Sequence, residues 1–310
     1  MKKQKQIKYS IIIPVFNSEK SIFLLSEKIH KVFLKIKENY EIIFIDDKSE
    51  NKKTWPALEK TAQKNKNVKI IQLTRNFGQQ AATLCGIEAA VGEYIITMDD
   101  DLQHSPEDIP LLIQEKHDYD IVIGRFIKKK HHIFKRIASR IKQYFDYKLI
   151  GKPAHIQLSS FRLFNQKTAK AMLNINTSYP FIPALMFYIT KSVVNVDISH
   201  YARFEGKTGY SLRKMLKVFS NLIINNSSLM LRFIGYMGIF ISMLSFIFGT
   251  ALIVQKMIYE TRVAGWTSMM VLLLFLGGIL LFTLGIIGEY LIRIISGIEK
   301  RPSYFIRKKK

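Results

Sequence analysis

Five short apolar segments recur in the first half of the chain, each rich in isoleucine or valine and bounded by polar residues. This length and composition predict buried β-strands. The segments are YSIIIPVF (9–16), YEIIFID (40–46), VKIIQL (68–73), EYIITM (93–98) and YDIVIG (119–124). Amphipathic stretches of helical spacing lie between them, for example residues 18–37 and 79–91. The alternation predicts an α/β fold with a mostly parallel sheet and helices on both faces.

Two apolar segments near the C-terminus, residues 233–254 and 267–288, contain no charged side chain. A helix of this length extends about 33 Å, which is enough to cross a hydrocarbon core of about 30 Å. We therefore predict a hairpin of two transmembrane helices joined by residues 255–266. The alternative is a buried helical hairpin in a soluble protein.

Basic residues crowd the outer ends of this hairpin, and the positive-inside rule therefore places both termini in the cytoplasm. They are Arg213, Lys214, Lys217 and Arg232 before it and Arg293, Lys300, Arg301, Arg307 and residues 308–310 after it. Four glycines of the second segment allow close helix packing, within one hairpin or between the subunits of a homo-oligomer. They are Gly277, Gly278, Gly285 and Gly288.

The chain of 310 residues carries a net charge of +23. This charge indicates anionic partners, which could be nucleic acid, acidic lipid or a phosphorylated substrate. The single cysteine, Cys85, excludes an internal disulfide framework and a cysteine-built metal site. Charge alone does not choose among the partners.

Acidic residues follow two of the predicted strands, Asp46 and Asp47 after the second and Asp99, Asp100 and Asp101 after the fourth. Ligands of parallel sheets bind beyond the carboxyl ends of the strands, so we expect these aspartates to meet in one crevice. Clustered carboxylates repel one another unless a cation neutralises them. We predict that the cation is Mg²⁺ or Mn²⁺. Asp99 and Asp101 would bind it, with Gln103 as a further oxygen ligand. The alternative is a solvated acidic turn.

The sequence motifs of other phosphate-binding protein classes are absent from this chain. No GxxxxGK[ST] loop is present and no GxGxxG follows the first strand, so the P-loop and dinucleotide-binding classes are not indicated. Basic and aromatic residues alternate in residues 125–152, but no nucleic-acid-binding motif accompanies them. We expect no nucleic acid partner.

A series of motifs resembles the family-two glycosyltransferases of the GT-A fold, and more narrowly their polyisoprenyl-phosphate glycosyltransferases. In order they are SIIIPVFNSE, FIDDKSE, LTRNFGQQAATLCGIEAAVGEYIITMDDDLQHSPED, IVIGR, SSFRLF, RFEGKTGYSLRK and GIIGEYLIRI. The resemblance extends over residues 9–307. It implies a metal-dependent enzyme that uses a nucleotide-sugar donor, with a UDP-sugar favoured.

The resemblance also implies roles for individual residues. Pro14, Phe16 and Asp47 match positions at the nucleotide, and Asp99, Asp101 and Gln103 match the metal and diphosphate site. Asp46 and Glu19 are also expected at the nucleotide, although Ser18 and not Glu19 stands where many relatives have glutamate. Asp100 is expected near the ribose or the sugar. Arg125, Arg203 and Lys207 would face the donor or its phosphates, and the alternative for either arginine is a surface salt bridge. We assign Asp101, Arg125 and Arg162 to catalysis.

One departure from the resemblance concerns the acceptor. Relatives often have an aspartate before the arginine that corresponds to Arg162, whereas no carboxylate lies between Lys148 and Arg162 here. A phosphate monoester has a second pKa of about 6, so a lipid phosphate is already ionised near pH 7 and needs no base. His155 and Asp146 stay weak candidates for a base.

These observations predict four segments. Residues 1–210 form a cytoplasmic GT-A domain, 211–232 an interfacial amphipathic region, 233–290 the two membrane helices and 291–310 a basic cytoplasmic tail. Residues 125–152 also have the character of an interfacial helix on anionic lipid.

The expected function is inverting transfer of a sugar to undecaprenyl phosphate at the cytoplasmic face of the plasma membrane, for modification of cell-envelope glycans. Two alternatives stay open. One is a related membrane glycosyltransferase with a different acceptor. The other is an inactive membrane scaffold, or an accessory to a flippase, with the same fold.

Overall fold

The computed structural model describes residues 7–126, 147, 150–175, 177, 180–199, 240, 247, 265–298 and 302–310. The chain divides into two compact units. One contains residues 1–209 together with 300–310, and the other contains residues 210–299. The first unit therefore takes in both ends of the chain, and the second is an excursion between them.

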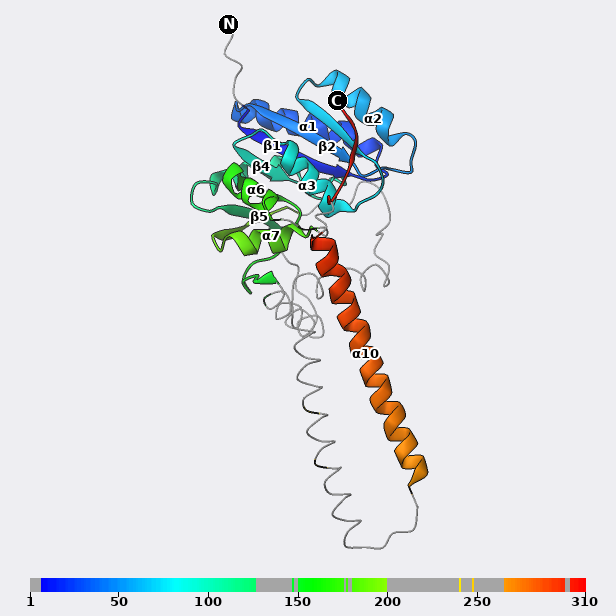
Figure 1. The fold of residues 1–310 in the computed structure, drawn as a ribbon. Helices are drawn as coiled ribbons and strands as arrows, with labels where there is room; N and C mark the ends of the chain where they lie inside the picture. Colours follow the sequence, from blue (N-terminus) through cyan, green and yellow to red (C-terminus); the bar gives the residue numbers. More distant parts are fainter. Residues whose placement is uncertain are drawn as a thin grey trace. The chain divides into compact units, whose positions relative to one another are not determined.

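Within the described residues, the first unit is a mixed sheet of eight strands in the order β7-β5-β6-β4-β1-β2-β3-β8 (Figure 1). The strands are β1 (Tyr9–Val15), β2 (Tyr40–Asp46), β3 (Val68–Leu73), β4 (Tyr94–Thr97), β5 (Ile121–Phe126), β6 (Arg162–Asn165), β7 (Val193–Ile198) and β8 (Ile306–Lys309). The helices are α1 (Lys20–Ile36), α2 (Thr54–Lys64), α3 (Gln79–Ala89), η1 (Pro106–Asp108), α4 (Ile109–Gln114), α6 (Gln166–Leu173) and α7 (Ile182–Ile189).

The α/β class and the mostly parallel sheet are as predicted, and two of the eight described strands run antiparallel to their neighbours. β1 pairs in parallel with β2 and β4, and β2 pairs in parallel with β3. β6 runs antiparallel to both β4 and β5, and β8 runs antiparallel to β3. The expectation counted only the five most apolar segments, and the two antiparallel strands lie outside all of them.

Helices cover both faces of the sheet because alternate residues of a strand point to opposite sides. On one face, Ile11 and Ile13 of β1 belong to a buried cluster with Leu25 of α1 and Leu58 of α2. On the other face α3 packs closely enough to require glycine. A Cβ atom at Gly86 would lie 2.3 Å from Cγ2 of Ile12, a distance that real side chains do not adopt.

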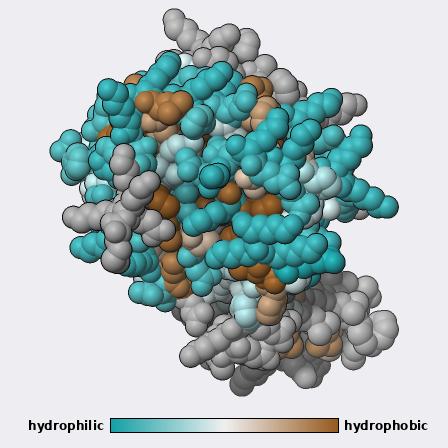
Figure 2. Space-filling view, turned by 90° about the horizontal axis from the view of Figure 1, so that it is seen from above, coloured by the Kyte–Doolittle hydropathy of each residue, from teal (hydrophilic) through white to brown (hydrophobic). Residues whose placement is uncertain are grey.

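The coloured part of the face seen from above in Figure 2 is mostly hydrophilic, with separate apolar patches. The interior is the reverse: Ile11, Ile42 and Phe44 have no exposed surface. Burial of this apolar area is the main stabilising contribution to the α/β unit.

In the second unit the structure describes one long helix, α10 (Trp266–Ile298), which includes the predicted second membrane segment. The predicted first segment, 233–254, lies outside the described residues except for Phe240 and Ile247. A search confined to the described residues finds no helix that is both long and apolar enough to cross a membrane. The predicted interfacial segments also lie almost wholly outside the described residues.

Candidate functional site

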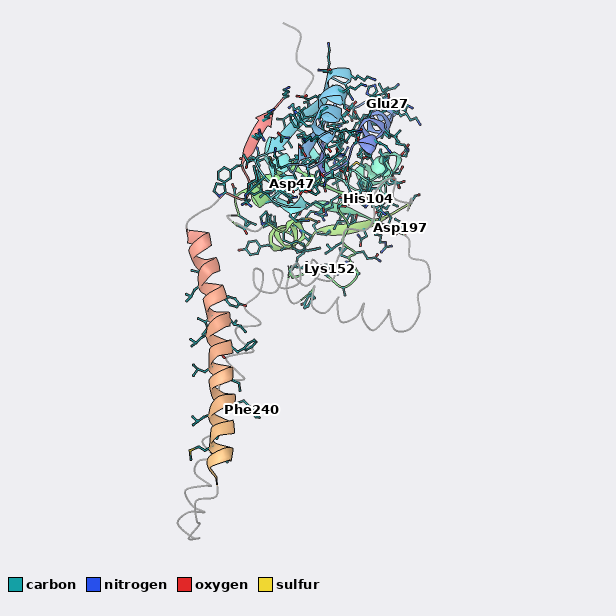
Figure 3. All side chains as sticks on the ribbon, turned by 90° about the vertical axis from the view of Figure 1, so that its right-hand side faces the viewer. Glu27, Asp47, His104, Lys152, Asp197 and Phe240 are labelled. Atoms are coloured by element: carbon teal, nitrogen blue, oxygen red, sulfur yellow. The ribbon has the colours of Figure 1, made fainter. Side chains whose placement is uncertain are left out.

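The candidate site lies where the carboxyl ends of β1, β2 and β4 meet. The parallel registers place Val15 of β1 beside Asp46 of β2, and Ile12 of β1 beside Thr97 of β4. The loops after these strands are therefore neighbours. Figure 3 shows Asp47 and His104, which follow β2 and β4, on the α/β unit.

Asn17 joins the loops after β1 and β2. Its backbone amide donates to Oγ of Ser49 at 2.8 Å. Its side-chain oxygen accepts from the amides of Glu50 and Asn51 at 2.8 and 3.0 Å. Asn17 has a φ of 62°, a left-handed conformation that asparagine tolerates better than most residues. The two loops thus form one bonded edge.

Asp46 and Asp47 are buried and use their carboxylates to hold the protein chain. Asp46 accepts from the amide of Ser49 at 2.9 Å and from Nε2 of Gln72 at 2.8 Å. Asp47 accepts from the amides of Phe77 and Gly78, both at 2.8 Å. Burial raises the pKa of Asp47, and the two backbone hydrogen bonds oppose that rise. Both aspartates therefore organise the loops at this end of the sheet.

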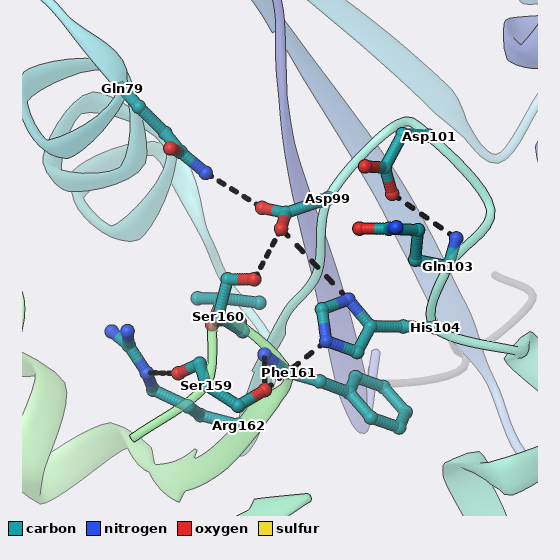
Figure 4. Close-up of polar contacts among 10 residues, drawn as sticks. Gln79, Asp99, Asp101, Gln103, His104, Ser159, Ser160, Phe161 and Arg162 are labelled. Carbon is teal, nitrogen blue, oxygen red and sulfur yellow. Dashed lines mark hydrogen bonds and ion pairs between the residues drawn. The ribbon is translucent and has the colours of Figure 1, made fainter. Parts of the chain in front are cut away.

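Asp99 is held from two sides, by side chains that the sequence analysis did not single out (Figure 4). Nε2 of Gln79, the first residue of α3, donates to Oδ1 of Asp99 at 2.6 Å. Oγ of Ser160, just before β6, donates to Oδ2 at 2.5 Å. Side chains from the start of α3 and from the residues before β6 thus determine the direction of this carboxylate.

His104 lies beside the same carboxylate and packs between two aromatic rings. Its Nδ1 is 3.9 Å from Oδ2 of Asp99, and its Nε2 is 3.2 Å from Oγ of Ser159. The imidazole stacks on Phe126 and Phe161 with ring centroids 5.0 and 5.4 Å apart. This packing fixes the position of the His104 ring next to the Asp99 carboxylate.

Arg162 is almost fully buried and lines a small pocket together with Pro14 and Asp99. Its Nε donates to the carbonyl oxygen of Ser159. Burial lowers the pKa of Arg162 to about 10, and the charge of Asp99 opposes that fall. Arg162 therefore stays protonated at neutral pH. Three residues predicted for the site share this pocket.

The turn after Asp99 separates the three aspartates. Oδ1 of Asp101 accepts from the amide of Gln103 at 3.1 Å across Leu102, whose φ is 58°. Burial raises the pKa of Asp100 to about 7, with the neighbouring Asp99 and Asp101 adding repulsion. Within the described residues, Oδ2 of Asp100 is buried without a hydrogen-bond partner.

Oδ2 of Asp100 is the carboxylate oxygen of this triplet that a hard cation would satisfy, because it is buried without a hydrogen-bond partner among the described residues. Over the described part of the chain, however, no three histidine, cysteine or acidic side chains converge as a metal cluster. Mg²⁺ in proteins is commonly held by only one or two carboxylates plus substrate phosphates, so a site for it need not contain three such side chains.

Arg125, which was predicted to face the donor, forms an ion pair with an acidic side chain on the neighbouring strand. Its Nε donates to Oδ1 of Asp197 at 2.5 Å, in the register that places the two residues side by side on β5 and β7. Their side chains are 37% and 53% exposed. The hydrogen bond lowers the pKa of Asp197. Arg125 is therefore part of a surface ion pair.

The remaining predicted residues are Phe16, Glu19, His155, Arg203, Lys207 and Asp146. Phe16 is 43% exposed beside the edge formed by the first two loops. Glu19 is the N-cap residue of α1 and makes no capping side-chain bond. His155 is exposed. Arg203, Lys207 and Asp146 lie outside the described residues.

Comparison with known proteins was made for both sequence and fold. The profile of a family described as Glycosyl transferase family 2 matches residues 10–173. An uncharacterized glycosyltransferase of Bacillus subtilis (strain 168) is 32% identical over 98% of this chain and 94% of its own length. The undecaprenyl-phosphate 4-deoxy-4-formamido-L-arabinose transferase of Photorhabdus laumondii is 30% identical over 97% of this chain and 94% of its own.

A solved structure shows the fold. Glucosyl-3-phosphoglycerate synthase from Mycobacterium tuberculosis, in complex with Mn²⁺, UDP and glucosyl-3-phosphoglycerate, has a TM-score of 0.52. The match covers 70% of this chain and 78% of that chain at 12% identity. The likeness establishes a GT-A-like α/β domain.

Proposed function

Since the chain belongs to glycosyl transferase family 2, we propose that it moves a sugar from a UDP-sugar to undecaprenyl phosphate, with inversion at the anomeric carbon. The acceptor is the one in the name of the Photorhabdus relative, whose similarity extends over nearly the whole chain. A different acceptor would be harder to reconcile with similarity over that length.

The observation that carries the proposal is the shared pocket of Asp99 and Arg162. Gln79 and Ser160 orient the carboxylate, while Arg162 is a buried cation beside it. A diphosphate leaving group and a phosphate nucleophile both need such fixed positive charge. Pro14, which lines the same pocket, marks the side on which the nucleotide would lie.

In the proposed reaction, a phosphate oxygen of the acceptor attacks C1 of the sugar. The bond between C1 and the diphosphate oxygen breaks, and UDP leaves with the electron pair of that bond. The acceptor is largely a dianion near pH 7, because the second pKa of a phosphate monoester is about 6. No proton has to be removed, which agrees with the absence of a carboxylate from residues 149–161.

We propose that Asp99, Asp101 and Gln103 hold Mg²⁺ or Mn²⁺ together with the donor diphosphate. When bound, the ion would neutralise negative charge on the leaving group. The buried, unbonded oxygen of Asp100 supports this assignment, since a third carboxylate in the turn raises the need for a cation. Asp47 would shape the nucleotide side by holding the amides of Phe77 and Gly78.

We also propose that residues 233–254 and 267–288 cross the membrane as a hairpin with the catalytic unit on the cytoplasmic side. The division of the chain supports this, because the excursion 210–299 begins and ends at the same unit. Both ends of a hairpin must lie on one side of the membrane. The basic segments that flank it would contact anionic lipid and bring the acceptor phosphate to the site.

The test is transfer of sugar in membranes that contain the full-length protein, supplied with a panel of radiolabelled UDP-sugars, undecaprenyl phosphate and Mg²⁺ or Mn²⁺. We expect one donor to give a lipid-extractable labelled product, and EDTA to abolish it. Replacement of Asp101 with alanine should lower the rate by at least about a hundredfold. Undiminished product from Asp101→Ala, or none from wild type with any donor, would refute the proposal.

A further inference from the structure

The C-terminal segment, residues 302–310, is part of the catalytic unit although it follows the long apolar segments in sequence. Its strand β8 pairs antiparallel with β3, placing Lys308 beside Gln72 and Ile306 beside Leu73. The backbones of Ile70 and Lys310 exchange two hydrogen bonds of 2.9 Å. β8 thus supplies the partner for a strand that would otherwise be the edge of the sheet.

Several side chains anchor the C-terminal segment from other directions. Oγ of Ser303 donates to the carbonyl oxygen of Thr177 at 2.6 Å, and Tyr304 donates to Glu88 of α3. On the α2 side, Nζ of Lys310 lies 2.5 Å from Oε1 of Glu59. The segment is therefore held by β3, by α2 and by α3 together.

Phe305 places this segment against residues 74–78, which we call the β3–α3 loop. The amide of Thr74 donates to the carbonyl oxygen of Phe305 at 2.9 Å. The rings of Phe305 and Phe77 lie 6.3 Å apart, centroid to centroid, at an angle of 46°. This geometry is within the range of favourable aromatic pairs. One residue thus contacts the beginning of the loop through its backbone and the loop's aromatic residue through its ring.

The same loop binds the site aspartates. Its last two amides, of Phe77 and Gly78, both donate to Asp47. The next residue, Gln79, donates to Asp99. A change in the position of Phe77 would therefore disturb the Asp47 bonds first and the orientation of Asp99 next.

We propose that Phe305 is a positioning residue for the donor site, acting through the β3–α3 loop. β8 holds Phe305 against Phe77, and this contact keeps the loop in the conformation that Asp47 and Gln79 require. Phe305 does not itself touch the donor. The inference rests on the proposed function, because it takes the nucleotide-sugar to bind at this edge of the sheet.

The test compares three full-length variants with wild type in the sugar-transfer assay. Phe305→Ala removes the ring and should raise the KM for the donor about tenfold, which corresponds to about 1.4 kcal/mol, while kcat changes less than twofold. Phe305→Tyr retains the ring and should restore the wild-type KM. Lys310→Ala removes an anchor that is remote from the loop and should leave both constants unchanged. All assays are run well below the unfolding temperature of each variant.

A second measurement tests the loop directly. Hydrogen–deuterium exchange of a fragment covering residues 74–79 should be faster in Phe305→Ala than in wild type or Lys310→Ala. Unchanged exchange, an unchanged KM, or a loss confined to kcat would each overturn the inference. If wild type transferred no sugar from any donor, the proposed function would be wrong. The exchange experiment would still test the contact between Phe305 and the β3–α3 loop.

Discussion

Ser160 donates a hydrogen bond to Oδ2 of Asp99 across 2.5 Å, although the two residues are 61 positions apart in the chain. Gln79 bonds the other oxygen of the same carboxylate. The direction of Asp99 is therefore determined by the start of α3 and the residues just before β6, which carry these two side chains. The site depends on these neighbours as much as on the aspartate.

The first prediction concerns this hydrogen bond. Ser160→Ala should lower kcat/KM by about tenfold and raise the concentration of Mn²⁺ needed for half-maximal rate, because Asp99 loses one of its two orienting bonds. Metal titration of the sugar-transfer rate measures the effect. Ser199→Ala, at an exposed serine outside the site, is the matched control and should behave as wild type. Equal metal requirements in the two variants would contradict the positioning role of Ser160.

Asp100 should give stability a pH dependence in the absence of metal. Its folded-state pKa of about 7 lies above the ordinary value of 3.8, so folding favours the protonated form. Its contribution to stability is therefore present below about pH 4 and lost as the pH rises through about 7. Asp100→Asn cannot ionise, and its advantage over wild type in unfolding free energy should grow by about 2 kcal/mol between pH 5 and pH 8.

Denaturant unfolding of the detergent-purified proteins in EDTA measures this difference. Added Mn²⁺ should reduce it, because the ion neutralises the carboxylates of the wild type. Parallel pH profiles for the two proteins would show that Asp100 is not destabilised in the folded state.

Arg125 and Asp197 provide a test that separates an ion pair from a catalytic arginine. Because the pair is exposed, either alanine variant should change the unfolding free energy by less than about 1 kcal/mol. If Arg125 also contacts the donor phosphates, Arg125→Ala lowers kcat/KM by tenfold or more while Asp197→Ala does not. We expect this asymmetry, and the two kinetic measurements side by side decide it. Equal activity of both variants would remove Arg125 from the catalytic set.

The close contact between α3 and the sheet predicts the effect of a single methyl group. Gly86→Ala would place a Cβ atom within van der Waals radii of Ile12 and Ile45, so the helix must move. We expect a loss of about 1–3 kcal/mol in unfolding free energy. Gly78→Ala serves as the comparison, because it changes backbone strain without a steric clash. Gly78 has a φ of 93°, and nothing lies within 4 Å of a Cβ atom placed there. Similar stability of Gly86→Ala and wild type would mean that the interface tolerates the displacement.

The strands that the sequence predicted are those buried on both faces. β1, β2 and β3 form continuous apolar runs because helices cover both sides of them. β6 is only four residues long, and β7 alternates apolar and polar positions. β8 reads IRKK and looks like a basic tail, since its strand conformation comes from pairing with β3 and not from its own composition. Charged residues are common on edge strands for the reason that they discourage further pairing.

The site was predictable in its location and less so in its roles. The hydrogen bonds that Asp46 makes to Gln72 and Asp47 makes to the amide of Phe77 have no signature in the sequence, because their partners lie about 26 and 30 positions away. Gln79 and Ser160 carry no catalytic signature, and they reach Asp99 only through tertiary packing. Arg162 was assigned to catalysis through the resemblance, and its burial in a pocket with Asp99 has no counterpart in the local sequence pattern.

β8 follows the excursion 210–299 in sequence, and this order has a consequence for biosynthesis. A ribosome makes residues 1–209 first, the excursion next and the partner strand of β3 after both. Until residues 302–310 emerge, the edge of β3 and the β3–α3 loop are without the contacts that β8 and Phe305 make. This end of the sheet can therefore mature only after the intervening segment has been synthesised. A newly made catalytic unit would stay incomplete until the chain beyond the excursion has folded back to it.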